Sequence, residues 1–241
     1  MLQKKVKNHP RNKYIEFDEQ AHSYTYYKKL RPKTPVKFNG ITGLIADHCA
    51  PFERDKIAYF IAKRDGITPE EVLAIWDKDR NYGNEVHKNI ENLVEYGEYI
   101  DCVELENFTK IMRQHNLTPI AAEWVIYNED IERASPIDLV CERNGELVLV
   151  DLKTMKKPIK TVPYRNKNKK MKGVFKSIYD SSYWKYCLQV SFYKYWVEEK
   201  YKLKVSDINY ILHIHKDNAE LIPAFYLPNE IKAIHNELKY I

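Results

Sequence analysis

Two acids and a lysine lie close together in the second half of this 241-residue chain. Asp138 lies inside one apolar run, and Asp151 and Lys153 end the next. The turn sequence Asn144-Gly145 separates the runs, so we expect two antiparallel strands. Two carboxylates at the rim of a sheet can bind a hard divalent cation, and Lys153 shares a strand face with Asp151 because side chains alternate. Such a group is suited to phosphodiester hydrolysis.

A basic segment follows this pair of strands. The chain as a whole is only mildly basic, with 39 basic and 34 acidic residues and a net charge of +5, but residues 153–176 hold ten Lys or Arg and no acid. A solvated loop is one interpretation. Its position after the acidic strand favours a surface that contacts a phosphate backbone. The candidate nucleic-acid-binding residues are Lys156, Lys157, Lys160, Arg165, Lys167, Lys169, Lys170 and Lys172.

The N-terminal part of the chain predicts a hairpin. Residues 1–12 are polar and basic, and we expect them to be mobile at the tip. Residues 14–18 and 22–27 are aromatic and β-branched runs around a turn, which is typical of paired strands. The segment 30–40 is interpreted as a loop with a short strand. Thr42 is placed to cap a helix.

Four helices are expected next, over 51–64, 68–77, about 83–97 and 103–115. The second has the clearest start, with Thr68 at the N-cap, Pro69 after it and acids in the first turn. The third carries apolar residues on one face and ends near Gly97.

The pattern then changes to strands over 121–127, 137–141 and 146–152. A long amphipathic helix is expected over 182–200, a core strand over 208–215 and a closing helix over 229–240. This order predicts an α+β (α/β-like) fold, with a central mixed sheet flanked by helices.

Composition excludes some classes of protein. The apolar and charged fractions are those of an ordinary globular protein, and no stretch has the length of a membrane span or the form of a signal peptide. The four cysteines are far apart and form no CxxC pair, so a zinc or iron–sulfur site is not expected. We expect a cytoplasmic protein, in the bacterial host cell if it is phage-encoded.

The order of elements together with the Asp…Asp-x-Lys pair resembles the PD-(D/E)xK nuclease superfamily. Two further motifs narrow the resemblance to its RecB-type exonuclease branch. Gly83-Asn-Glu-Val-His87 matches the metal-binding histidine on a helix before the strands, and Gln189-Val-Ser-Phe-Tyr193 matches a motif on the helix after them. The i, i+4 spacing places Gln189 and Tyr193 on one helix face.

The resemblance implies a role for each matching residue. Asp138 and Asp151 would share the metal, with His87 as a nitrogen ligand and the carbonyl of Leu152 as a further ligand. Lys153 would position or help to deprotonate the attacking water. Gln189 and Tyr193 would orient the lysine or the substrate phosphate.

Glu123, on the preceding strand, is either a further metal ligand or a surface acid. The oxygen-rich site predicts Mg²⁺, with Mn²⁺ as a substitute because of the histidine. The number of ions, one or two, stays open.

The chain departs from the branch in two ways. Ala134-Ser-Pro136 stands where the branch usually has a glycine before the first aspartate. The C-terminal cysteines that bind an iron–sulfur cluster in several RecB-type nucleases are absent from the sequence. The chain is therefore more similar to cluster-free members such as the mitochondrial genome maintenance exonuclease and phage exonucleases.

The resemblance implies a metal-dependent DNA exonuclease that acts on single strands or strand ends, in recombination, repair or phage genome processing. Its partners would be DNA and phage or host recombination or replication proteins. The domain plan is an N-terminal hairpin and helical cap (1–82) packed on the nuclease core (83–241). A restriction-type or structure-specific endonuclease, a non-catalytic DNA-binding module, and an RNA or small-molecule hydrolase remain alternatives.

Overall fold

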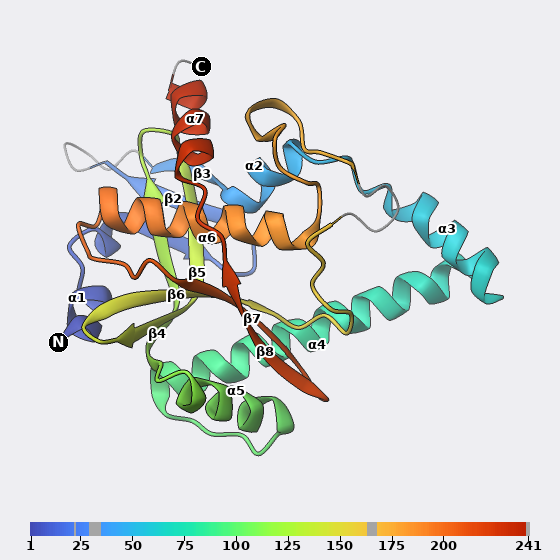
Figure 1. Cartoon of the computed structure of the whole chain (residues 1–241), viewed down its shortest axis with the longest axis horizontal. Coiled ribbons are helices and arrows are strands. Elements are labelled where there is room, and N and C mark those ends of the chain that lie inside the picture. The colour runs from blue at the N-terminus through green and yellow to red at the C-terminus, as the bar shows by residue number, and fades with distance from the viewer. Residues whose placement is uncertain (22, 29–34, 163–167, 240–241) are drawn as a thin grey trace.

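A mixed β-sheet flanked by helices forms the centre of the protein (Figure 1). The computed structural model describes residues 1–21, 23–28, 35–162 and 168–239, and within them eight strands form this sheet. The strands are β1 (Ile15–Asp18), β2 (Ser23–Tyr27), β3 (Pro35–Gly40), β4 (Thr118–Asn128), β5 (Arg133–Arg143), β6 (Glu146–Lys153), β7 (Asn209–His215) and β8 (Asn218–Ala224). The helices are α1 (Leu2–Lys7), α2 (Ile41–Asp47), α3 (Arg54–Asp65), α4 (Pro69–Tyr96), α5 (Val103–Gln114), α6 (Ser182–Glu199) and α7 (Pro228–Lys239). The predicted α+β fold is confirmed at this level.

The sheet divides beside β5. One edge of β5 pairs with β4 along most of its length. The other edge pairs first with β3, at Arg133 and Ala134, and then with β6 from Leu139 onward. A short part of β5 between these two partners is therefore left without a neighbour on that edge. Asp138 lies at this fork.

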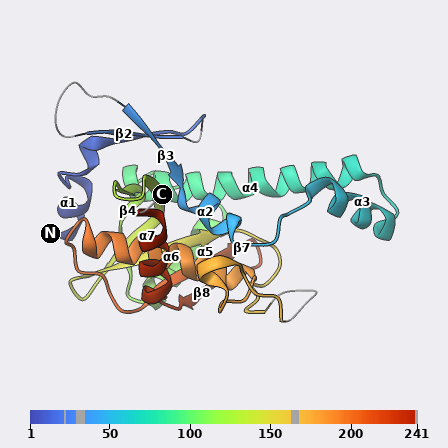
Figure 2. The same cartoon turned by 90° about the horizontal axis from the view of Figure 1, so that it is seen from above.

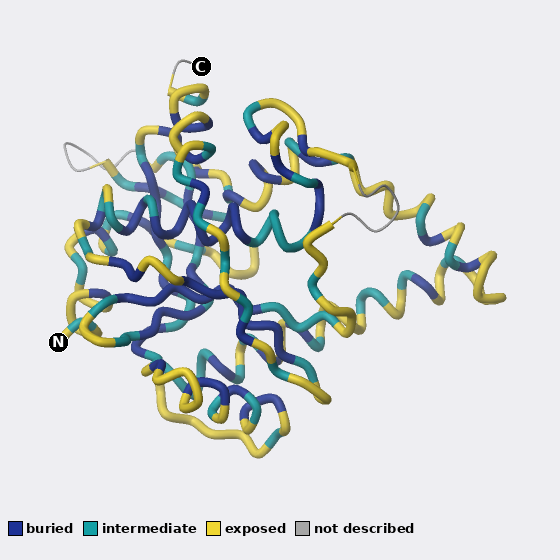
Figure 3. Tube along the Cα trace, viewed as in Figure 1, coloured by how far each residue is buried: buried dark blue, intermediate teal, exposed yellow. Residues whose placement is uncertain are grey.

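Helices cover both faces of the sheet. On β6, Leu147 and Leu149 pack in the cluster that contains α6, whereas Val148 and Val150 pack in the cluster that contains α4 and α5. Alternation continues to the end of the strand, so Asp151 and Lys153 lie on the α6 side. Figure 3 shows how deeply the central strands and α6 are buried.

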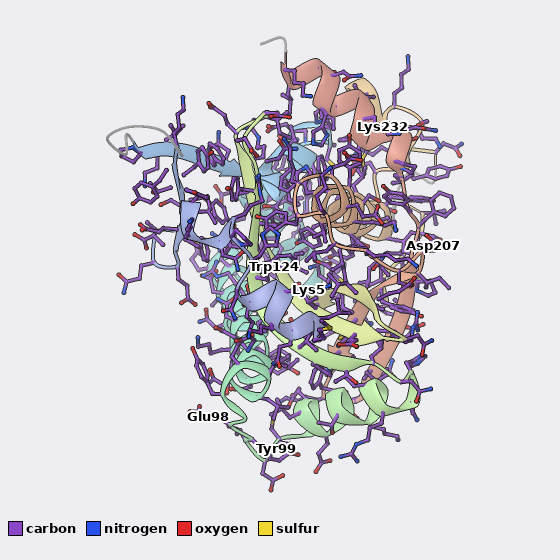
Figure 4. The ribbon with its side chains drawn as sticks, turned by 90° about the vertical axis from the view of Figure 1, so that its left-hand side faces the viewer. Lys5, Glu98, Tyr99, Trp124, Asp207 and Lys232 are labelled. Atoms are coloured by element: carbon purple, nitrogen blue, oxygen red, sulfur yellow. The ribbon has the colours of Figure 1, made fainter. Side chains whose placement is uncertain are left out.

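The N-terminal segment packs on β4 through α1, a helix that was not predicted. Val6 of α1 is fully buried. The Arg11 guanidinium donates to Glu129 at 2.6 Å and lies 4.2 Å from the centre of the Tyr127 ring. Figure 4 shows α1, which carries Lys5, lying against β4 near Trp124.

Helix α4 is one continuous helix of 28 residues, not the two helices predicted over 68–77 and 83–97. Polar residues 77–81 look like a break in the sequence, but they are solvated within the helix. The capping box of Thr68 and Glu71 starts the helix and the left-handed Gly97 ends it, as expected. With α3, the first half of α4 forms an arm that extends away from the sheet (Figure 2). The predicted division between residues 82 and 83 lies inside α4.

Other differences are smaller. Gly40, not Thr42, is the N-cap of α2, and no side chain caps that helix. Helix α3 begins at Arg54 rather than at Pro51. The hairpin, α5, α6, β7 and α7 lie close to their predicted ranges, although His22 and Tyr240 are outside the described residues. Strand β8 was not predicted.

Helix α6 is not a surface amphipathic helix, because nearly all its residues from Cys187 to Val197 are buried. In addition to the sheet, α2 and α7 pack against this helix. Among the described residues, no helix combines the length and apolar character needed to cross a bilayer.

Candidate active site

Asp138, Asp151 and Lys153 come together at the fork between β5 and β6. If the pairing of Leu139 with Val150 were extended by one step, Asp138 would lie opposite Asp151. Instead, the backbone N–H of Leu152 donates to Asp138 Oδ2 at 2.6 Å. Lys153 Nζ lies 2.7 Å from Asp151 Oδ2 and 3.9 Å from Asp138 Oδ2. It also donates to the carbonyl of Leu152 at 2.9 Å.

His87 and Glu123 complete a cluster with Asp138. His87 Nδ1, from the middle of α4, lies 3.6 Å from Glu123 Oε1 and 4.0 Å from Asp138 Oδ1. One ligand atom from each of the three residues lies within 4.8 Å of the others. The sequence left the role of Glu123 open, and the structure brings it to this cluster.

Glu123 has an unusual backbone conformation. Its φ is 47°, in the left-handed region, although it lies within β4. The register of β4 against β5 passes from Ala122–Leu139 to Trp124–Ile137 and omits the Glu123–Asp138 pair. A non-glycine residue in this region costs on the order of 1–3 kcal/mol, and such strain is concentrated at functional sites. This backbone conformation accompanies the position of the Glu123 carboxylate beside His87 and Asp138.

Asp151 is fully buried. Burial raises the pKa of its carboxyl group and Asp138 adds to the effect, while the Lys153 ammonium opposes it. Lys153 meets Oδ2 at ion-pair distance but not in hydrogen-bond geometry, and no described group donates a hydrogen bond to either oxygen. The carboxylate is therefore short of partners within the protein.

His87 is also affected by its neighbours. Burial alone would lower the pKa of the imidazole, but the contact with Glu123 and the charge of Asp138 outweigh burial and raise that pKa. Burial raises the pKa of Glu123, with His87 opposing it.

The donor set fits a divalent cation. The cluster offers carboxylate oxygens and one imidazole nitrogen, the ligands used for Mg²⁺ and Mn²⁺. Asp138, Asp151 and the Leu152 carbonyl all direct oxygens toward the Lys153 ammonium. Asp151 lies outside the compact cluster of three ligands. His87, Glu123 and Asp138 would hold the ion, with Asp151 and Leu152 beside it.

A glycine allows α4 to approach the end of β6. A Cβ atom on Gly83 would lie 2.7 Å from Thr154 Oγ1, closer than real Cβ contacts. Gly83 is one turn before His87 on the same helix. Its lack of a side chain therefore helps to set the distance of His87 from the strands.

Two tyrosines and one glutamine of α6 lie beside the site: Tyr186, Gln189 and Tyr193. Gln189 Nε2 donates to the Tyr193 hydroxyl at 2.5 Å, and both residues are buried. The ring of Tyr186 lies 4.8 Å from Lys153 Nζ. Tyr186 was not among the predicted site residues, although its i, i+3, i+7 spacing with Gln189 and Tyr193 is a signal that places it with them.

The basic residues divide into groups. Lys156 pairs with Asp79 of α4 at 3.0 Å, Lys169 pairs with Asp180 at 3.4 Å, and Lys170 donates to the Ser177 carbonyl. The first of these contacts joins the segment to α4, and the other two lie within residues 169–180. The predicted residues Arg165 and Lys167 lie outside the described residues. Lys157, Lys160 and Lys172 line cavities beside the site.

Three cavities surround this site. One of about 700 Å³ contains His87, Glu123 and Asp138. A second of about 910 Å³ shares Lys153 and Thr154 with it. A third of about 630 Å³ shares Tyr186 with the second. Together they form a cleft that begins at β1, passes the acidic cluster and ends near α2.

Neither a family model nor a curated protein matches the sequence of this chain. The geometry of the site and the motif resemblance therefore carry the functional argument.

Proposed function

We propose that this chain is a metal-dependent deoxyribonuclease with a RecB-type PD-(D/E)xK core, and that it acts as an exonuclease on single-stranded DNA or strand ends. The observation that carries the proposal is the convergence of His87, Glu123 and Asp138 beside Asp151 and Lys153 at the fork of β5 and β6. These residues come from four elements, α4, β4, β5 and β6, and chance motifs in sequence have no reason to meet in space.

In the proposed reaction, water adds to the phosphorus atom, the bond from phosphorus to a sugar oxygen breaks, and that oxygen takes up a proton. A bound Mg²⁺ or Mn²⁺ supplies Lewis acidity and lowers the pKa of the attacking water. Glu123 and Asp138 would supply the negative charge that such an ion needs, and His87 would supply a nitrogen ligand. Lys153, tethered by Asp151, places an ammonium group where it can contact a phosphate oxygen. Gln189 and Tyr193, which are hydrogen-bonded to each other on α6, would orient Lys153 or the substrate phosphate.

Cleavage of labelled DNA tests the proposal. Oligonucleotides labelled at the 5′ or the 3′ end, single- and double-stranded, are incubated with Mg²⁺, Mn²⁺ or EDTA. We expect cleavage with either metal and none with EDTA. A circular single strand should remain intact if a free end is required, and an RNA strand tests the preference for DNA.

Site variants connect the activity to these residues. Asp138→Asn should lower the rate by more than about 100-fold, because loss of a ligand exceeds the 10–100-fold effect of residues that only orient ligands. Glu98→Gln is the matched control, since Glu98 is an exposed acid in the connection after α4 (Figure 4). A parent protein that binds DNA but cleaves it with neither metal would support a binding module instead.

A further inference from the structure

Phe52 is a large apolar side chain left in solvent beside the cleft. It lies between α2 and α3, and 66% of its surface is exposed. It lines both the cavity of about 910 Å³ and the cavity of about 630 Å³. Burying such a side chain is worth about 1.5–3 kcal/mol, so a ligand that covers the ring at this concave surface gains binding free energy.

The position of Phe52 is held from two sides. Its ring lies 5.7 Å from the ring of Trp76 on α4. The backbone N–H of Ala50, two residues before it, donates to Asp180 at 3.0 Å, and Asp180 pairs with Lys185 of α6 at 2.9 Å. Pro51 restricts the backbone between these anchors. Phe52 is therefore fixed relative to both the arm and α6.

The cleft connects Phe52 with the acidic site. Phe52 and Lys153 both line the cavity of about 910 Å³, and Tyr186, which lies against Lys153, lines this cavity and the one of about 630 Å³. Tyr186 and Lys185 are neighbours on α6 and line both cavities. A strand with a phosphate at Lys153 would extend along Tyr186 toward Phe52.

The charge around Phe52 favours a nucleic acid over an apolar protein segment. Lysines line both cavities, and the acids Asp79 and Asp180 of the larger cavity each pair with a lysine. An exposed aromatic ring in a cationic groove is the arrangement that stacks bases of single strands, whose backbone follows the positive charge.

We propose that Phe52 is a base-stacking platform for the single strand that flanks the phosphate at Lys153. This inference rests on the proposed function for the direction of the strand, but the stacking itself requires only binding. The occupant is a nucleobase, not a particular sequence, because every base offers an aromatic face. Phe52 is thus a positioning residue and takes no part in bond cleavage.

Binding to a short single strand tests the inference. Fluorescence anisotropy is measured in an Asp151→Asn background, so that the strand stays intact, with Phe52→Ala, Phe52→Trp and Phe60→Ala. Phe60 is the matched control, because it is a phenylalanine of the neighbouring helix α3, 51% exposed, and lines neither cavity. We expect Phe52→Ala to raise the dissociation constant by about 5- to 150-fold. Phe52→Trp should bind as the parent does, and Phe60→Ala should remain within about twofold.

Abasic strands separate stacking from other effects of the substitution. A strand that lacks one base at the position over Phe52 should bind the parent more weakly, and Phe52→Ala should add little to that loss. An equal effect of Phe52→Ala on a fully abasic strand would overturn the inference, as would unchanged binding of the normal strand.

The inference and the proposed function can fail separately. A protein that shows the stacking effect but cleaves no DNA with Mg²⁺ or Mn²⁺ retains the platform and loses the nuclease assignment. A protein that cleaves DNA normally and binds equally well with Phe52→Ala retains the assignment and loses the platform. Absence of any nucleic-acid binding overturns the inference, and exposed Phe52 would then be tested for protein partners.

Discussion

Asp138 of β5 accepts a hydrogen bond of 2.6 Å from the backbone N–H of Leu152 on β6. The bond crosses the point where the two strands stop pairing, and it satisfies a backbone donor that the fork would otherwise leave without a partner. The other carboxylate oxygen, Oδ1, faces His87. One side chain thus joins the end of the strand pair to the candidate metal ligands.

This double role predicts that two substitutions of Asp138 separate stability from activity. Asp138→Asn keeps an oxygen that can accept from Leu152, whereas Asp138→Ala leaves the N–H unpaired. We expect the alanine variant to be less stable than the asparagine variant by about 1–3 kcal/mol. Both should lose cleavage. Urea unfolding measures the first effect, and equal stability of the two variants would contradict the role in the fold.

The left-handed backbone of Glu123 predicts a second separation. Glycine adopts a φ of 47° without the steric cost that alanine meets. Glu123→Gly should therefore be more stable than Glu123→Ala by about 1 kcal/mol, and both variants should bind Mn²⁺ more weakly than the parent. Thermal unfolding and Mn²⁺ titration provide the measurements. An alanine variant as stable as the glycine variant would mean that Glu123 is not strained.

The close approach of Gly83 to Thr154 predicts a rescue. Gly83→Ala improves helix propensity by about 1 kcal/mol, but its Cβ would press against Thr154 Oγ1 and displace α4 with His87. We expect lower cleavage by Gly83→Ala, nearly normal cleavage by Thr154→Ala, and recovery in the double variant. A double variant as impaired as Gly83→Ala would show that this contact is not the cause.

The buried Arg11 predicts that the N-terminal segment contributes to stability. Its guanidinium donates to Glu129 and to the Tyr127 carbonyl and packs on the Tyr127 ring. Arg11→Met should lower the free energy of unfolding by about 1–3 kcal/mol. Lys5→Met, on the exposed side of α1, is the control and should change it little. Urea unfolding compares the two, and equal effects would indicate that charge alone matters.

His235 predicts a pH dependence of stability away from the candidate site. Its Nε2 accepts from Trp196 Nε1 at 2.8 Å and its Nδ1 donates to the Ile231 carbonyl at 2.6 Å, so the ring is neutral. Burial lowers the pKa of this histidine; Lys239 and Lys200 add to the effect, and Asp130 and the bond to the Ile231 carbonyl oppose it. The unfolded chain therefore binds the proton first as pH falls.

The stabilisation is complete above the ordinary histidine pKa of about 6.5 and is lost as pH falls below it, by at most about 1.4 kcal/mol per pH unit for one site. Melting temperatures between pH 8 and pH 5 measure this loss. The decline should be shallower in His235→Gln. An identical decline in that variant would assign it to other groups.

Local patterns were sufficient for much of the fold. The meander of β4, β5 and β6 follows from apolar runs and from Asn144-Gly145, whose φ values of 53° and 78° are those of the expected tight turn. Helix α5 and the ends of α4 were predicted for the same reason, because caps and periodicity depend on neighbouring residues. The continuity of α4 was missed because a solvated polar segment resembles a break when its surroundings are unknown.

Contacts between distant segments account for the other differences. Strand β8 pairs with β7 and has little apolar alternation of its own. The packing of the N-terminal segment depends on the ion pair of Arg11 with Glu129, which lies in the connection from β4 to β5. The burial of α6 on several sides comes from α7 and the sheet, which its own sequence does not describe.

For the site, the sequence by itself determined that Asp151 and Lys153 share a strand face and that Asp138 lies on the neighbouring strand. Strand alternation and one tight turn are sufficient for that result. The motif resemblance also predicted His87 beside Asp138. Only the tertiary structure decided that Glu123 joins them, that Asp151 lies against Lys153, and that Phe52 lies beside the same cleft. Those positions depend on how α4, β4 and α6 pack on the fork, and packing joins residues that no local spacing relates.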